Sequence, residues 1–158
     1  MKSSGIKTST VLASFLLAAC LSMRAEVKLP AIFSDGMVMQ QQTNANLWGT
    51  ATPNKKVTVT TGWNGKQYAV TADKNGSWKL SVSTPEAGGP YPITFDDGTQ
   101  KTLNNILIGE LWLCSGQSNM EMPMKGFKNQ PVENANMDIL HSKNPQIRLF
   151  TLKRTSPF

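Results

Sequence analysis

The residues best suited to chemistry lie where an apolar run ends in a small, polar turn. Leu111 to Cys114 is apolar, and Ser115-Gly116-Gln117-Ser118-Asn119 follows directly. A strand that ends in Gly-x-Ser can raise a serine hydroxyl above the edge of its sheet, where a base and a substrate carbonyl can reach it. The spacing therefore makes Ser118 a candidate serine nucleophile, with Gly116 and Gln117 as supporting residues of the turn.

Three neighbours of Ser118 have side chains that deserve comparison with it. Ser115 precedes the glycine and does not occupy the Gly-x-Ser position, so we interpret it as a loop residue. Cys114 ends an apolar run and has no cationic neighbour in the sequence to activate its thiol, so we expect it to be packed and inert. Asn119 can hold the turn through side-chain bonds to the backbone, which makes it a supporting residue of the site.

His141 is the one histidine of the chain, and Asp138-Ile139-Leu140-His141 spells Asp-x-x-His. A general base must come within about 2.6–3.2 Å of the serine oxygen. This tetrapeptide ends a predicted helix that follows closely after the candidate nucleophile. We therefore interpret His141 as a solvated residue at a helix end, where the C-terminal carbonyls favour a cation.

The elements before this turn are short and strand-like. Between Glu26 and Leu103, apolar and polar residues alternate in short runs that Gly, Pro, Asn and Asp separate at close intervals. Val57 to Thr60 alternates with period two, and Asn64-Gly65 divides it from residues 67–71, which is a hairpin pattern. The pattern predicts a small antiparallel β-sandwich domain over residues 26–105.

The pattern changes after this region. Residues 106–108 and 111–114 are apolar at consecutive positions, which is typical of strands buried on both faces of a parallel sheet. Residues 131–140 predict a helix, and residues 147–152 predict another strand. Strand, helix and strand form the first step of an α/β domain, which needs several more such steps to cover its sheet. We therefore expect residues 106–158 to be the incomplete N-terminal part of such a domain.

Residues 1–25 are predicted to be an export signal. Lys2 and Lys7 precede an apolar run from Val11 to Ala19, which is too short to span a bilayer as a helix. Leu-Ala-Ala-Cys, ending at Cys20, resembles the bacterial lipoprotein box and predicts a signal of residues 1–19 with lipid on Cys20. Ordinary cleavage near Ala25 is the alternative, and both remain open. Either one predicts a periplasmic protein, or one anchored by lipid at the cell envelope of a bacterium.

Charge and cysteine content restrict the partners. The net charge is +6 over 158 residues, but three basic residues lie in the predicted signal and the others are scattered singly or in pairs. No nucleic-acid partner is therefore expected. The two cysteines, Cys20 and Cys114, provide no disulfide framework. We expect no metal or other cofactor, and membrane contact only through a lipid on Cys20.

Sixteen consecutive residues, Gly109 to Met124 (GELWLCSGQSNMEMPM), resemble the nucleophile block of bacterial sialate O-acetylesterases, which belong to the SGNH-hydrolase superfamily. Leu29 to Gln40 resembles the segment that opens the mature family members, and Ile147 to Phe150 fits the strand after the block. The resemblance extends over nearly all of the sequence after the signal. It implies a β-sandwich domain followed by the truncated start of an SGNH-hydrolase-like, flavodoxin-like α/β domain.

The resemblance also implies roles for individual groups. Ser118 would attack the acetyl carbonyl of an O-acetylated sugar and form an acyl-enzyme that water then clears. The backbone N–H of Ser118 would be one oxyanion donor. The other donors of the family, a Gly and an Asn, and its Asp-x-x-His belong to blocks that follow the part matched here. We therefore expect the 158-residue chain to be inactive alone.

Three functions agree with these observations. The first is an exported carbohydrate esterase that removes O-acetyl groups from sialic acids or related sugars. The second is an acetylxylan-type esterase, because the nucleophile block alone does not select the sugar. The third is a non-catalytic β-sandwich module that binds glycan or packs against a catalytic domain. Among the tryptophans, we assign Trp48 and Trp78 to the core and expect Trp63, beside a hairpin tip, to make the exposed contact.

Overall fold

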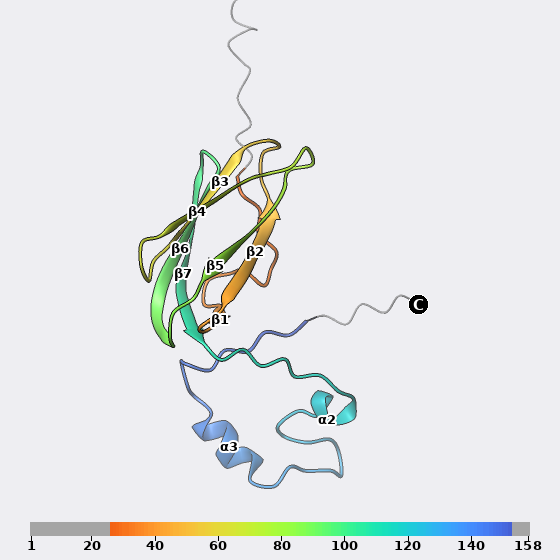
Figure 1. Cartoon of the computed structure of the whole chain (residues 1–158). Helices are drawn as coiled ribbons and strands as arrows, with labels where there is room; N and C mark the ends of the chain where they lie inside the picture. Colours follow the sequence, from red (N-terminus) through yellow and green to blue (C-terminus); the bar gives the residue numbers. More distant parts are fainter. Residues whose placement is uncertain (1–25, 153–158) are drawn as a thin grey trace, which may run out of the picture.

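The computed structural model describes residues 26–152, so the predicted export signal and Cys20 lie outside the described residues. Most of the regular structure consists of strands that curl around one apolar core, and the helices are few and short (Figure 1). The strands are β1 (Val38–Gln40), β2 (Asn44–Thr50), β3 (Lys56–Thr61), β4 (Gln67–Thr71), β5 (Ser77–Ser83), β6 (Gly88–Asp96) and β7 (Gln100–Gly109).

The strands form two sheets. A five-stranded sheet has the order β1-β7-β6-β3-β4, and β2 pairs with β5 in a two-stranded sheet. The two sheets share one core, because buried side chains of both belong to the same apolar cluster. Phe95 of β6 and Trp78 of β5 meet there with ring centroids 6.0 Å apart. The larger fully buried apolar side chains of this cluster are Val27, Leu47, Val57, Val59, Val82, Ile93, Phe95 and Ile106.

The predicted turns explain how the strands reverse. Asn64-Gly65 joins β3 to β4 in an antiparallel hairpin, with Thr60 opposite Gln67. Gly65 has a φ of +67°, a backbone conformation that glycine adopts without a steric penalty. At the turn between β6 and β7, the Asp96 carboxylate accepts a hydrogen bond from the Gly98 N–H at 2.7 Å. The pairing of β3 with β4 confirms the hairpin predicted at Asn64-Gly65.

The prediction of an antiparallel sandwich is confirmed only in its coarser form, as a β-rich unit. The pairing of β1 with β7 is parallel, with Val38 opposite Leu107. The predicted boundary between residues 105 and 106 falls inside β7, which pairs antiparallel with β6. Ile106 and Ile108 are buried because they point into the core of the β-rich unit, while Leu107 between them is half-buried. This alternation belongs to a strand buried on one face, and the expectation for residues 106–108 was wrong in that respect.

Beyond β7 the chain contains two short helices, α2 (Ser118–Glu121) and α3 (Ala135–His141). The helix predicted over residues 131–140 is confirmed from Ala135 onward. The strands predicted over residues 111–114 and 147–152 are not formed in the described part of the chain. Residues 111–114 have no neighbouring strand to pair with among the described residues, and Trp112 and Leu113 are 80% and 87% exposed. Residues 106–152 therefore form no sheet of their own.

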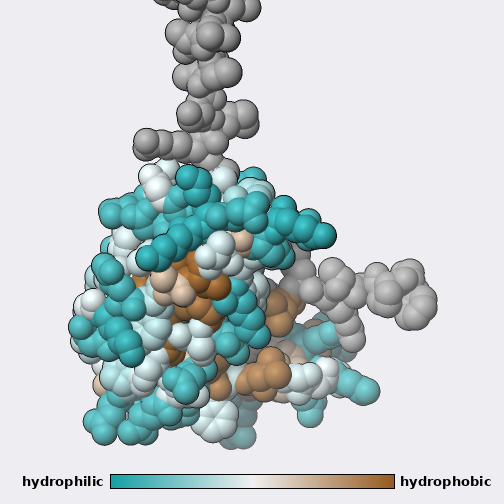
Figure 2. All heavy atoms as spheres, turned by 45° about the horizontal axis from the view of Figure 1, so that its top comes forward, coloured by the Kyte–Doolittle hydropathy of each residue, from teal (hydrophilic) through white to brown (hydrophobic). Residues whose placement is uncertain are grey.

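On the face of the molecule seen in Figure 2, hydrophilic residues surround a central patch of hydrophobic residues, and further hydrophobic residues are visible below it. Within residues 26–152, no helix is both long and apolar enough to cross a membrane.

Candidate active site

Ser118 is the first residue of α2 and is exposed, as are Gly116, Gln117 and Asn119. The helix begins at Ser118 without a side-chain cap, and the Met120 N–H donates to the Gln117 carbonyl at 2.9 Å. A side chain at Gly116 would come within 2.6 Å of the Met120 Cγ, so the glycine lets Met120 fold back against the turn. The serine hydroxyl thus lies on a tight turn that solvent can reach.

Glu110, the first residue after β7, is hydrogen-bonded to the end of β1. The Gln41 Nε2 donates to Glu110 Oε1 at 2.6 Å, and the Gln40 Nε2 donates to Glu110 Oε2 at 3.2 Å. The Gln40 Oε1 in turn accepts from the Leu111 N–H at 2.9 Å. The hydrogen bonds from Gln41 and then Gln40 stabilise the carboxylate and lower the pKa of Glu110. These bonds fasten the segment that leads to Ser118 to the end of β1.

A second link returns the chain to the β-rich unit after α3. The Arg148 Nη1 donates to the Gly36 carbonyl at 2.7 Å and also to the carbonyl of Asn105. The Arg148 Nη2 donates to the Asn105 Oδ1 at 3.0 Å. The segment from Glu110 to Arg148, which carries Ser118, is therefore attached to the β-rich unit at both ends. Sequence reasoning missed Glu110 and Arg148, because both lie in stretches that were interpreted from their apolar neighbours.

The alternative nucleophiles and bases are placed as follows. Ser115 is an exposed loop residue, as predicted. Cys114 is free and exposed, so the expectation that it packs inside was wrong. Cys114 is exposed because the apolar residues 111–114 have no neighbouring strand to cover them. His141 is the exposed last residue of α3, and none of the hydrogen bonds found in residues 26–152 joins it to Ser118.

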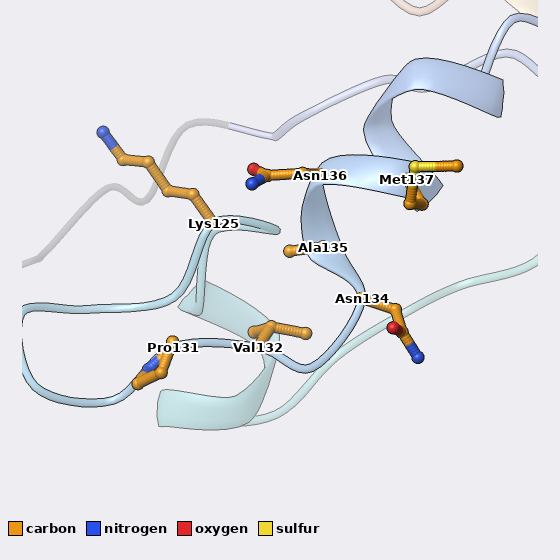
Figure 3. Close-up of a pocket in the computed structure, with 7 residues that line it drawn as sticks. All are labelled: Lys125, Pro131, Val132, Asn134, Ala135, Asn136 and Met137. Atoms are coloured by element: carbon orange, nitrogen blue, oxygen red, sulfur yellow. The ribbon is translucent and has the colours of Figure 1, made fainter.

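A hollow of about 230 Å³ lies between the loop at Lys125 and the start of α3. Figure 3 shows Pro131 and Val132 on its lower side and Ala135 and Asn136 beside it. Ser118 is not among the residues that line this hollow, so it is not the acyl pocket of the candidate nucleophile. Within the described residues, no group of His, Cys, Asp or Glu side chains could hold a metal ion.

The tryptophans differ from the prediction at two positions. Trp78 is buried in the core as predicted, but Trp48 is 43% exposed. Trp63 is half-buried, donates its indole N–H to the Ser83 carbonyl at 3.1 Å, and meets Tyr91 edge to face. The exposed aromatic ring of the β-rich unit is therefore Trp48. The alternation of β2 places Leu47 and Trp48 on opposite faces, and in the structure Leu47 is the one that points into the core.

Comparison with solved structures defines the class of protein. The chain is similar to a carbohydrate acetylesterase from Xanthomonas citri, with 36% sequence identity and a TM-score of 0.59. The match covers 63% of this chain and 23% of that one. The fold of the matched part is therefore similar to part of a carbohydrate acetylesterase. No protein-family model matches the chain.

Comparison with characterised sequences identifies the family. The human sialate O-acetylesterase is 30% identical over 119 residues, which are 69% of this chain. The mouse sialate O-acetylesterase is 35% identical over 108 residues. The chain belongs to a sialate O-acetylesterase-like family, which confirms the resemblance derived from the nucleophile block. It spans only about a quarter of its relatives: the matches cover 23% of the human protein and 20% of the mouse protein.

Proposed function

We propose that this chain is part of an exported esterase that removes O-acetyl groups from sialic acids or related sugars, with Ser118 as the nucleophile. The observation that carries the proposal is the nucleophile block from Gly109 to Met124, together with relatives that are named sialate O-acetylesterases. The exposure of Ser118 on the turn before α2 supports the role, because a buried hydroxyl could not meet a sugar ester.

The chemistry is a two-step acyl transfer. The Ser118 Oγ attacks the acetyl carbonyl carbon while a base accepts its proton, and the carbonyl oxygen becomes an oxyanion that the Ser118 N–H helps to stabilise. The C–O bond to the sugar then breaks, and the sugar oxygen leaves as a hydroxyl after taking up a proton. Water attacks the acetyl-serine in the same way, releasing acetate and restoring the hydroxyl. Gly116, Gln117 and Asn119 shape the turn that presents Ser118.

We further infer that the β-rich unit is a sandwich and that the chain after β7 is the start of an α/β domain of the SGNH-hydrolase type. The exposed apolar runs support this inference. Leu111 to Leu113 and Leu149 to Leu152 have the composition of central strands in a parallel sheet, and their side chains are exposed in this structure. Additional strands beside these runs would pair their backbones and cover their side chains.

The decisive experiment compares two serines of the same exposed loop. In the longest natural polypeptide that contains this chain, Ser118→Ala should lower acetate release from an O-acetylated sialic acid by roughly 10³-fold or more. Ser115→Ala is the matched control and should retain most of the activity. Wild-type rates in Ser118→Ala would overturn the proposal. Faster release from acetylated xylan than from the sialic acid would instead favour the acetylxylan-type esterase.

Export and lipid attachment form a separate part of the proposal. The N-terminal charge and apolar run support removal of the signal, either before Cys20, with lipid on the cysteine, or near Ala25. Mass spectrometry of the mature N-terminus distinguishes the two. A diacylglycerol-modified Cys20 indicates an anchor at the cell envelope, and an unmodified terminus after Ala25 indicates a periplasmic protein. An intact Met1 in cytoplasmic material would contradict export.

A further inference from the structure

The described chain begins at the end of the β-rich unit where β7 starts. The Glu26 carboxylate pairs with the Lys101 ammonium at 3.2 Å, and Lys101 is the second residue of β7. Val27 is fully buried, and Lys28 exchanges two backbone hydrogen bonds with Thr50, the last residue of β2. Burial and backbone pairing fix this point, so the residues that precede Glu26 join the β-rich unit at this end.

The serine-bearing segment leaves from the opposite end of the same strand. The part of β7 from Lys101 to Gly109 extends over about 25 Å. Strand β1 runs parallel to β7, so both strands end on the same side, where the side chains of Gln40 and Gln41 hold the Glu110 carboxylate. Figure 1 shows the described chain starting at one end of the β-rich unit and α2 lying beyond the other end.

The candidate nucleophile stays at that far end. Ser118 lies on the turn that begins α2, and the chain returns to the β-rich unit only after α3, where Arg148 donates to Gly36 and Asn105. Because both attachments of the segment lie toward the end of β7, the segment has no link to the end at Glu26. The start of the described chain and the candidate nucleophile are therefore separated by the length of β7.

The predicted lipid attachment lies close to this start in the sequence. The stretch from Cys20 to Glu26 spans at most about 20 Å in any conformation, because a fully extended residue covers only about 3.3–3.6 Å. A lipid on Cys20 therefore keeps the end at Glu26 near the membrane. The distance from that end to Ser118 is then set by the β-rich unit.

We propose that the β-rich unit is a spacer that holds Ser118 away from the membrane that carries the lipid on Cys20. The candidate active site then faces the surrounding solution, and it acts on sugars that are free or displayed on another surface, not on glycolipids of its own membrane. This inference rests on the lipid attachment in the proposed function. It does not rest on ester hydrolysis, because the position of Ser118 relative to the membrane can be measured without it.

The test measures short-range energy transfer from two positions of the lipidated chain to phosphatidylcholine vesicles that carry an acceptor dye on a lipid headgroup. The first donor dye is attached to Cys114, a free and exposed thiol near Ser118 in the sequence. The second is attached to Gln100→Cys in a Cys114→Ser background, at the exposed start of β7. Transfer from Cys114 should be weaker by about twofold or more, because that donor lies farther from the anchor by the length of β7.

Equal transfer from the two positions, or stronger transfer from Cys114, would overturn the proposal, because the β-rich unit would then lie along the membrane. Mass spectrometry of the same sample separates this result from a failure of the proposed function: a chain without lipid contradicts the anchor, and the spacer with it. Cys20→Ala, labelled at Cys114 and mixed with the same vesicles, is the matched control and should show no transfer. Transfer from this control would mean that adsorption places the protein on the membrane, and the spacer would be wrong.

Discussion

Arg148 joins two parts of the chain that are distant in sequence. Its guanidinium donates to Gly36 in the turn before β1 and to Asn105 in β7. A fork of donors on two carbonyls and one amide oxygen is a geometry that lysine cannot reproduce. The stabilisation that Arg148 gives through these three hydrogen bonds therefore requires an arginine.

Arg148→Lys and Arg148→Ala should both destabilise the chain, by about 1–2 kcal/mol, because hydrogen bonds from a charged donor are lost. The measurement is the midpoint of urea unfolding, compared with Lys143→Ala as an exposed cation of the same region. Unchanged midpoints in both Arg148 variants would show that the fork adds nothing to stability.

The hydrogen bonds that Gln40 and Gln41 donate to the Glu110 carboxylate, just after β7, are sensitive to acid. The hydrogen bonds from Gln41 and Gln40 lower the pKa of its carboxyl in the folded chain from the ordinary value of 4.5. A carboxyl whose pKa is lower in the folded state stabilises the fold at pH above its unfolded pKa, and this stabilisation is lost as pH falls through the folded pKa.

The expected result is that wild type is slightly more stable than Glu110→Gln above the ordinary carboxyl range, and that the difference disappears in more acidic solution. The carboxyl is fully exposed, so the effect is small. Thermal unfolding across that pH range measures it, with Glu86→Gln as a control at another exposed glutamate. A difference that grows toward acid pH would have the wrong sign.

At the scale of elements, the turn before β5 is held by a close backbone approach. Gly76 has a φ of +83°, and a side chain there would come within 2.4 Å of the Ala51 carbonyl. Asp73 closes the same turn by accepting from the N–H groups of Asn75 and Ser77 at 2.8 Å each. The turn thus brings β5 into register with β2.

Gly76→Ala should therefore cost more stability than Gly65→Ala. Both positions have positive φ, but nothing lies within 4 Å of a side chain at Gly65, so that variant carries only the conformational penalty of about 1 kcal/mol. Gly76→Ala adds a clash and should lose roughly 2–4 kcal/mol in total. Chemical denaturation of the two variants gives the difference, and equal losses would show that the turn relaxes away from Ala51.

At the scale of the whole molecule, stability is concentrated in the β-rich unit. The core cluster draws its members from the strands and the segment before β1, whereas the chain after Glu110 buries few side chains. Low density of buried apolar contacts makes a region open locally at little cost.

Hydrogen exchange of the 158-residue chain should therefore show protected amides in β3, β6 and β7 up to Gly109, and rapid exchange over residues 111–117. The limit of protection should fall at the end of β7 and not at residue 105. Strong protection of residues 111–117 in a monomer would contradict this expectation.

The positions of His141 and Ser118 predict whether the 158-residue chain can hydrolyse esters alone. None of the hydrogen bonds described within residues 26–152 joins His141 to Ser118, and a general base must come within hydrogen-bond reach of the serine hydroxyl. We expect no serine-dependent hydrolysis of aryl acetates by the 158 residues. Turnover that is lost in both Ser118→Ala and His141→Ala, but kept in Ser115→Ala, would assign His141 as the base.

Local patterns were sufficient for the short strands before residue 105, the Asn64-Gly65 hairpin and the exposed turn at Ser118, because alternation and turn residues act over a few neighbours. They were not sufficient where burial depends on distant partners. Ile106 and Leu111 belong to similar apolar runs, yet one is buried inside β7 and the other is exposed. Pairing with β1 and β6 accounts for the first, and the lack of a neighbouring strand accounts for the second. Trp48 faces outward for a related reason, since an alternating strand does not reveal which face the opposite sheet will cover.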